Sequence, residues 1–187
     1  MNTIQNVKSF ADHKPANPNF LSQSGSTKAN WETVVSLNQC LAHAIDLRSQ
    51  TKQALWNAKG PNSYGVQKML KEFSKQIDTM SDELSKRILT FGGTPVWTIA
   101  NVSKSSQLLK RRREPDIETS SFEELISDYD AVAQSLTPVM QQAVKSNDYG
   151  TASLITDFAR MLDDQCQAVV AHLPVESNGN AKKVTAY

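Results

Sequence analysis

Residues 66–88 read VQKMLKEFSKQIDTMSDELSKRI, and this stretch decides the fold class. Its apolar side chains recur every three or four residues, the spacing that places them on one face of an α-helix. The pattern continues over enough turns to make the helical period unambiguous. We therefore predict a long amphipathic helix that ends before Gly92 and Gly93. Its apolar face consists of Val66, Met69, Leu70, Phe73, Ile77, Met80, Leu84 and Ile88.

A second amphipathic pattern precedes this helix. It begins at Trp31 and stops at the pair Gly60-Pro61, because both residue types are disfavoured inside a helix. Its apolar residues are Val34, Leu37, Leu41, Ile45 and the run from Ala54 to Trp56. Core or interface packing accounts for Trp56 and for Trp97, with no redox role required.

Two further helices follow. Ser121 and Glu124 form a capping box that opens the third helix, and Pro138 inside it predicts a kink. Asn147 or Asp148 can cap the fourth helix. The apolar residues are Phe122, Leu125, Ile126, Tyr129, Val132, Leu136, Val139 and Val144 in the third helix, and Leu154, Ile155, Phe158, Leu162, Cys166, Val169 and Leu173 in the fourth.

The chain divides into a bundle and two tails. Residues 1–30 and 174–187 have few apolar side chains and are predicted to be flexible. Residues 31–173 hold the helices, and a long connection from Gly92 to Ser120 carries a predicted short helix near Ala100–Ser106. A long connection can cross a bundle and join parallel helices. The predicted fold is all-α, a ferritin-like four-helix bundle with a crossover between helices two and three.

Bulk composition restricts the partners and the compartment. With 20 Lys+Arg against 19 Asp+Glu the net charge is +1, so there is no general attraction for nucleic acid or acidic membranes. No apolar run has membrane-spanning length, and the first residues lack a signal-peptide core. Cys40 and Cys166 lie inside apolar helical patterns rather than in a paired spacing. We therefore expect a cytoplasmic protein with reduced, buried thiols and no membrane partner.

Two motifs resemble those of the Dps family of mini-ferritins. Residues 46–60, DLRSQTKQALWNAKG, match the family's first signature, D-L-x-x-x-T-K-x-A-H-W-N-x-x-G, except at Leu55. Residues 77–98, IDTMSDELSKRILTFGGTPVWT, are similar to the second signature, in which a metal-binding acid pair precedes a Gly-Gly-x-Pro turn. The resemblance covers residues 31–173. It implies a dodecameric shell that oxidises iron at sites shared by two-fold-related subunits.

The resemblance also implies where the iron ligands would lie. In the family, one subunit supplies two histidines and an aspartate, and its neighbour supplies an aspartate and a glutamate. A gap-free alignment puts Leu55, Gln67 and Lys71 at the first set and Asp82 and Lys86 at the second. Leucine has no lone pair and an ammonium group is a cation without an acceptor. With four of five ligands changed, the ferroxidase centre is expected to be degenerate, and Asp82 remains as a weak metal ligand.

The substitutions also change the charge of that site. Each carboxylate-to-lysine change moves the site from anionic towards cationic. We expect Asp82 to pair with Lys71 across the two-fold interface, with Lys86 one turn along as an alternative partner. The simpler alternative is that all three side chains lie at a solvated interface edge, where ion pairs contribute little.

The family's iron-entry pore carries an aspartate near the start of helix four, in a T-x-D pattern. Here Thr151-Ala152 is followed by Ser153, although Asp148 and Asp157 lie nearby and could line a pore. Cation entry through this pore is therefore in doubt.

Few other residues are candidates for metal chemistry. None of His13, His43 and His172 falls at a ligand position, and we expect His43 and His172 to be structural. Asp163 and Asp164 could hold mineral inside a cavity, although acids on a helix face are commonly just solvated.

Lysine-rich segments are the candidates for DNA contact. The run at residues 110–113 is the densest, although it could equally be a solvated loop or an intersubunit salt-bridge site. Tails repeated on many subunits could add up to binding that is sensitive to salt and independent of base sequence. The candidate residues are Lys8, Lys14, Lys28, Lys110, Arg111, Arg112, Arg113, Lys182 and Lys183.

Three functional hypotheses follow. The first is a Dps-like stress-protection cage without cofactor, which binds and protects DNA at the nucleoid or acts as a scaffold, alone or in a mixed shell with an active paralogue. The second is an enzyme, an active mini-ferritin that oxidises iron and stores ferric iron through an altered or relocated site. The third is a bundle recruited to an unrelated interaction through its tails. The ligand losses favour the first hypothesis, and iron turnover separates it from the second.

Overall fold

The computed structural model describes residues 27–96, 98–106, 108 and 121–172, and these residues form helices and no strand. They confirm the all-α fold and the short helix in the crossover. The first helix begins at Thr27, ahead of the expected start at Trp31. The elements are α2 (Thr27–Asn57), α3 (Ser63–Thr90), α4 (Ile99–Ser105), α6 (Ser121–Lys145) and α7 (Tyr149–Val170).

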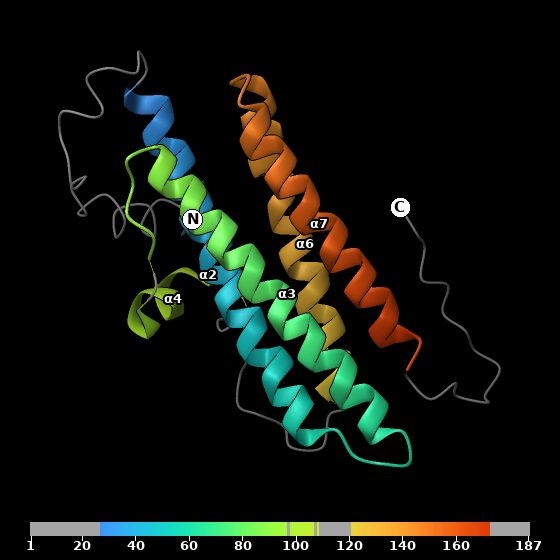
Figure 1. Cartoon of the computed structure of the whole chain (residues 1–187). Coiled ribbons are helices and arrows are strands. Elements are labelled where there is room, and N and C mark those ends of the chain that lie inside the picture. The colour runs from blue at the N-terminus through green and yellow to red at the C-terminus, as the bar shows by residue number, and fades with distance from the viewer. Residues whose placement is uncertain (1–26, 97, 107, 109–120, 173–187) are drawn as a thin grey trace, which may run out of the picture.

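The long helices form a bundle of two antiparallel pairs (Figure 1). α2 packs along α3, α6 packs along α7, and the pairs meet chiefly through α2 and α6. α3 and α6 run in the same direction, as expected for helices joined by a crossover. α4 lies outside the bundle and contacts α2.

The predicted apolar face of α3 is the face that the bundle buries. Leu70, Ile77, Leu84 and Ile88 are fully buried, and the methionines and phenylalanine of the same face are half-buried. The small side chain of Ser81 completes this face and donates to the Ile77 carbonyl at 2.8 Å. Burial of this face, with the matching faces of the other long helices, stabilises the bundle.

Trp56 is not part of this core. Its side chain is 74% exposed, whereas Ala54 is buried. Two residues along a helix correspond to a rotation of about 200°, so Ala54 and Trp56 cannot share a face. The expectation that Val144 is buried is also wrong: it is 51% exposed, because its neighbour Ala143 takes the inward position.

The crossover is attached to α2 by two groups of hydrogen bonds. Asn38 is buried, and its Oδ1 accepts from Val96 N at 2.8 Å while its Nδ2 donates to the Thr94 carbonyl at 3.2 Å. Asp46, the first residue of the 46–60 motif, is 4% exposed and accepts from Ser106 Oγ at 2.6 Å. Gln50 Nε2 donates to the other oxygen of Asp46 at 3.1 Å. Asp46 therefore fixes the end of α4 against α2.

In the described part of the chain, no helix combines the length and the apolar character needed to cross a membrane.

Candidate functional site

The expected ligand positions lie on α2 and α3. Leu55 is near the end of α2, Gln67 and Lys71 lie in the first turns of α3, and Asp82 and Lys86 lie further along α3. From Lys71 to Asp82 the helix advances about 16 Å. One metal ion cannot span that distance, so a single subunit holds two separate halves of the expected site.

The half formed by α2 and the start of α3 has no metal ligand set. Leu55 is half-buried and packs against the core. Gln67 is exposed, and its Nε2 donates to the Ala58 carbonyl at 3.4 Å, a contact that ties α3 to the preceding turn. Lys71 is exposed, and within the described residues its ammonium group has no hydrogen bond or ion pair.

The other half is dominated by a lysine paired with a glutamate outside the ligand set. Lys86 Nζ lies 2.7 Å from Glu83 Oε1, and the two side chains are well exposed. This hydrogen bond, with the charges of Glu83 and then Asp82, raises the pKa of Lys86 above its ordinary value, so its ammonium group stays charged. Asp82 is exposed and makes no hydrogen bond or ion pair with the described residues of its own subunit.

Potential metal ligands do not gather anywhere else in the described ranges. No group of three or more His, Cys, Asp or Glu side chains there is arranged to hold a metal ion. The two described histidines lie apart from the ligand positions. His43 is buried with its Nδ1 3.0 Å from Ser135 Oγ, and His172 is exposed with its Nδ1 2.8 Å from the Ala168 carbonyl. The buried environment of His43 agrees with the structural role predicted for it.

Charge is segregated along α2 and α3, which the motif comparison did not reveal. From Leu47 to Lys71 the sequence has no Asp or Glu. Counting partners among the described residues alone, only Arg48 of the cations in that stretch forms an ion pair, and its partner is Asp78 of α3. The carboxylates of α3 begin at Glu72, and three of them occupy its second half. The cations of the acid-free stretch are Arg48, Lys52, Lys59, Lys68 and Lys71.

Large apolar side chains are exposed beside the ligand positions. Trp56 follows Leu55 and is 74% exposed, and Tyr64 in the first turn of α3 is 81% exposed. Trp56 near the end of α2 and Tyr64 near the start of α3 thus lie on either side of the turn that joins these helices, and both rings are exposed. Of the two sequence-based explanations for Trp56, core packing is excluded and interface packing remains.

The acids expected near a pore are engaged within the subunit. Asp148 is the N-cap of α7: its side chain accepts from Thr151 N at 3.0 Å and forms an ion pair with Arg87 of α3. This confirms Asp148 as the capping residue. Asp157 is exposed, and its Oδ1 lies 3.3 Å from Arg160 Nη1. A cation approaching either acid therefore meets a carboxylate that already has a cationic partner.

All but one of the DNA-contact candidates lie outside the described residues. Residues 8, 14, 110–113, 182 and 183 are not among the described residues, and neither are Trp97 and His13. Lys28 lies in the first turn of α2, with its side chain not described.

Comparison with known proteins identifies the relatives of this chain. The profile of the ferritin-like domain family matches residues 35–174. The chain is 31% identical to a DNA protection during starvation protein of Agrobacterium fabrum over 141 residues, covering 75% of this chain and 87% of that protein. It is 25% identical to the protein of the same description from Helicobacter pylori, covering 76% of this chain and 99% of that one.

Solved structures agree on the fold. The structure is similar to the crystal structure of a Dps protein from Vibrio cholerae O1, with a TM-score of 0.71 at 21% identity over 86% of this chain and 98% of that one. It is also similar to DpsC from Streptomyces coelicolor, with a TM-score of 0.73 at 20% identity over 79% of this chain and 86% of that one. At these identities the likeness establishes the ferritin-like bundle.

Proposed function

Because this chain belongs to the ferritin-like domain family, and within it to the Dps proteins, we propose that it forms a stress-protection shell that does not oxidise iron at the family's shared site. The shell would be a dodecamer, or a mixed shell with a paralogue that keeps the iron ligands. Its partner would be DNA, bound without base specificity, and its location the cytoplasm and nucleoid.

The chemistry of the five ligand positions carries this proposal. Lys71 and Lys86 place two ammonium groups where the family has carboxylates, and Leu55 removes one imidazole. Iron(II) needs lone pairs from nitrogen or oxygen, and neighbouring cations repel it. Asp82 alone supplies one carboxylate against two lysines. Within the described residues, no group of three or more His, Cys, Asp or Glu side chains is arranged to hold a metal ion.

The charge pattern of α3 supports a replacement for the metal. If two copies pair with their α3 helices antiparallel, the acid-free start of one helix faces the carboxylate-rich half of the other. Lys71 would then meet Asp82 of the partner subunit, and both side chains are unpaired in the described part of their own subunit. The exposed rings of Trp56 and Tyr64 would be covered in the same contact. An ion pair would thus occupy the place of iron and leave assembly independent of metal.

DNA contact is assigned to the cationic segments that the sequence offers. Two relatives are described as DNA protection during starvation proteins. In this chain the run at residues 110–113 and the lysines of the two ends supply cations without an acidic excess nearby. Such contacts neutralise phosphates and are cumulative across a multi-subunit shell.

Iron turnover tests the enzymatic part of the proposal. Purified protein is titrated anaerobically with Fe²⁺, exposed to oxygen or hydrogen peroxide, and followed by the absorbance of ferric iron and by the iron retained. We expect no oxidation above the rate in buffer. A variant carrying Leu55→His, Gln67→His, Lys71→Asp and Lys86→Glu should bind Fe²⁺ and oxidise it.

A matched variant separates ligand restoration from a change of charge. Lys68→Asp with Lys75→Glu makes the same charge change on α3 at positions outside the ligand set and should remain inactive. Stoichiometric binding and rapid oxidation by the unaltered protein would contradict the degenerate site. Sedimentation of the unaltered protein in the presence of a chelator tests whether the shell assembles without metal.

DNA binding is tested separately by the mobility of plasmid DNA at increasing salt concentration. We expect retardation that weakens steeply with salt, and a loss of binding when residues 110–113 are changed to alanine. Unchanged binding by that variant would assign the contact to Lys8, Lys14, Lys28, Lys182 and Lys183.

A further inference from the structure

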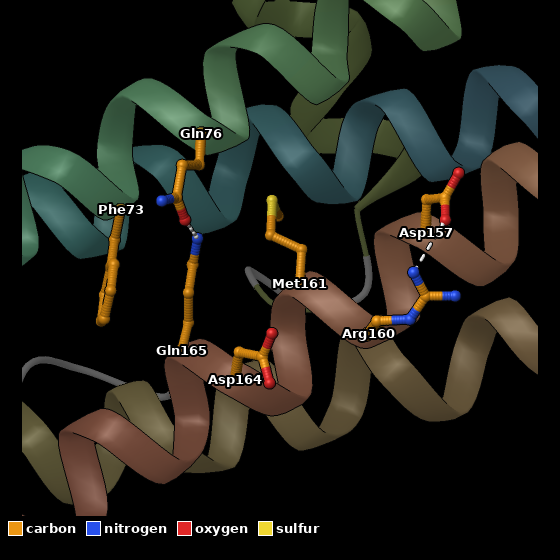
Figure 2. A pocket seen from close by; sticks show the side chains of 7 residues that line it. All are labelled: Phe73, Gln76, Asp157, Arg160, Met161, Asp164 and Gln165. Carbon is orange, nitrogen blue, oxygen red and sulfur yellow. Dashed lines mark hydrogen bonds and ion pairs between the residues drawn. The ribbon is translucent and has the colours of Figure 1, made fainter.

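A groove of about 400 Å³ lies between α3 and α7, away from the ligand positions discussed above. Figure 2 shows Gln76 of α3 and Gln165 of α7 meeting across it, with Phe73 on one side and Met161 on the other. Asp157, Arg160 and Asp164 continue the α7 side of the groove. Its volume is within the range of small-molecule sites in proteins.

The base of the groove contains an unsatisfied hydrogen-bond acceptor. Gln165 is 1% exposed, and its Nε2 donates to Gln76 Oε1 at 2.8 Å. Its own Oε1 is buried and has no hydrogen-bond partner among the described residues. A buried amide oxygen without a donor has a free-energy cost, so a donor that enters the groove and reaches this oxygen would be favoured.

The charges of the groove select for a cation. Asp157 is engaged by Arg160, 3.3 Å away. Asp164 is exposed and has no ion pair or hydrogen bond with the described residues. The lining therefore has one carboxylate in excess, located one residue before Gln165 on α7. An anion would find no free cation here.

The same arrangement does not suit a chelated metal ion. Asp157 and Asp164 are seven residues apart on one helix, which corresponds to about 10 Å along its axis. They cannot share one ion, and no group of three potential ligands forms in the described structure. A divalent cation would have only one free carboxylate, whereas a site for such an ion normally assembles several oxygen ligands.

The walls favour an organic ion with an apolar body. Phe73 and Met161 are half-buried and contribute an aromatic ring and a thioether to the groove. An aromatic ring attracts a nearby cation and also packs against hydrocarbon, and methionine adapts to irregular apolar shapes. The groove thus combines a carboxylate, an amide acceptor and an apolar wall.

We propose that the α3–α7 groove binds a small primary amine in its protonated form, with a hydrocarbon or aromatic body. The ammonium group donates to Asp164 and, once the Gln165 amide turns its buried oxygen to the groove, to Gln165 Oε1, and the body lies against Phe73 and Met161. A primary ammonium carries three donors, enough to serve both acceptors and one water molecule. This site is independent of iron oxidation and of DNA contact.

Calorimetric titration of the purified full-length protein with phenethylammonium tests the proposal, with binding to Asp164 checked by variants. We expect phenethylammonium to bind saturably. Phenethyl alcohol, which keeps the ring and loses the charge, should bind at least about tenfold more weakly than the amine. Asp164→Asn should weaken amine binding by a similar factor, because it removes the charge and keeps the shape. Asp163→Asn is the matched control: it removes the adjacent exposed acid, which does not line the groove, and should leave binding unchanged.

A second variant tests the amide. Gln165→Leu should weaken binding of the amine more than binding of the alcohol, and circular dichroism checks that the bundle is intact. Equal binding of amine and alcohol, equal effects of the Asp163 and Asp164 substitutions, or no saturable binding of the amine would overturn the proposal. Saturable binding of Mn²⁺ that requires Asp164, with none of phenethylammonium, would overturn it as well and identify a metal site instead.

Discussion

Arg87, near the end of α3, is ion-paired with Asp148, the N-cap of α7. Arg87 Nε also donates to Thr151 Oγ1 at 2.9 Å, and its guanidinium lies 4.8 Å from the centroid of the Phe91 ring. The charged side chains are only 26% and 14% exposed. This contact joins α3 to α7 at one end of the bundle, although the two helices belong to different antiparallel pairs.

Replacing Arg87 should therefore destabilise the bundle. Arg87→Met leaves the Asp148 carboxylate largely buried without its cation, and we expect the free energy of unfolding to fall by roughly 2–3 kcal/mol in urea denaturation. Lys75→Met is the control, because Lys75 pairs with Glu72 on an exposed face. It should change stability by less than about 0.5 kcal/mol, and equal losses in the two variants would contradict the assigned role of Arg87.

Substitution by alanine should have opposite effects on stability at Gly93 and at Gly65. A Cβ at Gly93 would lie 2.6 Å from Val34 Cγ1 and 3.0 Å from Ile88 Cγ2, whereas a Cβ at Gly65, inside α3, meets nothing within 4 Å. Gly93→Ala should cost about 1–3 kcal/mol through overpacking, and Gly65→Ala should stabilise by up to about 1 kcal/mol through helix propensity. Thermal and chemical denaturation measure both, and a stabilising Gly93→Ala would show that the turn moves freely away from α2.

The buried hydrogen bond between Asp46 and Ser106 predicts a local effect on the crossover. Ser106→Ala leaves one buried oxygen of Asp46 without its donor and should cost about 1–3 kcal/mol. Limited proteolysis should cut the chain between α3 and α6 faster in this variant. Ser103→Ala, at an exposed position of α4, is the control and should behave like the unaltered protein. Identical cleavage in both variants would mean that Ser106 does not anchor the crossover.

The Cys40 thiol predicts a loss of stability at alkaline pH. Burial raises its pKa from 9.0 to about 12, because the buried thiolate is poorly solvated. Because the pKa of the thiol is higher in the folded protein than in the unfolded chain, the unfolded chain loses the thiol proton first. The free energy of unfolding is therefore unaffected by this group below pH 9 and falls as the pH rises towards 12. At about pH 10 the loss is roughly 1.4 kcal/mol.

The comparison with Cys40→Ala isolates this contribution, since other groups titrate in the same range. The unaltered protein should lose more stability than the variant between neutral pH and pH about 10. Parallel curves for the two proteins would contradict the assigned burial of the thiol. Cys166 is only half-buried, which corrects the expectation that both thiols are buried, and it should react first with a thiol reagent.

Much of the fold follows from patterns that need no tertiary information. The apolar residues of α3 from Val66 to Ile88 recur at the helical period, and the structure buries the face that they form, as predicted. Asp148 caps α7 because an acid before a helix can accept from its free amide groups. The exposure of Trp56 is the exception. The apolar run from Ala54 to Trp56 leaves open which of its residues face the core, and the packing of the bundle buries Ala54 and leaves Trp56 exposed.

The sequence by itself determined the helices, the crossover and the identities at the ligand positions, because these depend on local periodicity, on turn residues and on a motif written along the chain. Only the tertiary structure decided which polar side chains from distant parts of the chain meet: Arg87 with Asp148, and Gln76 with Gln165 across the groove. Both pairs join residues more than sixty positions apart. Their partners depend on how the helices pack, and many packings are compatible with the same apolar stripes.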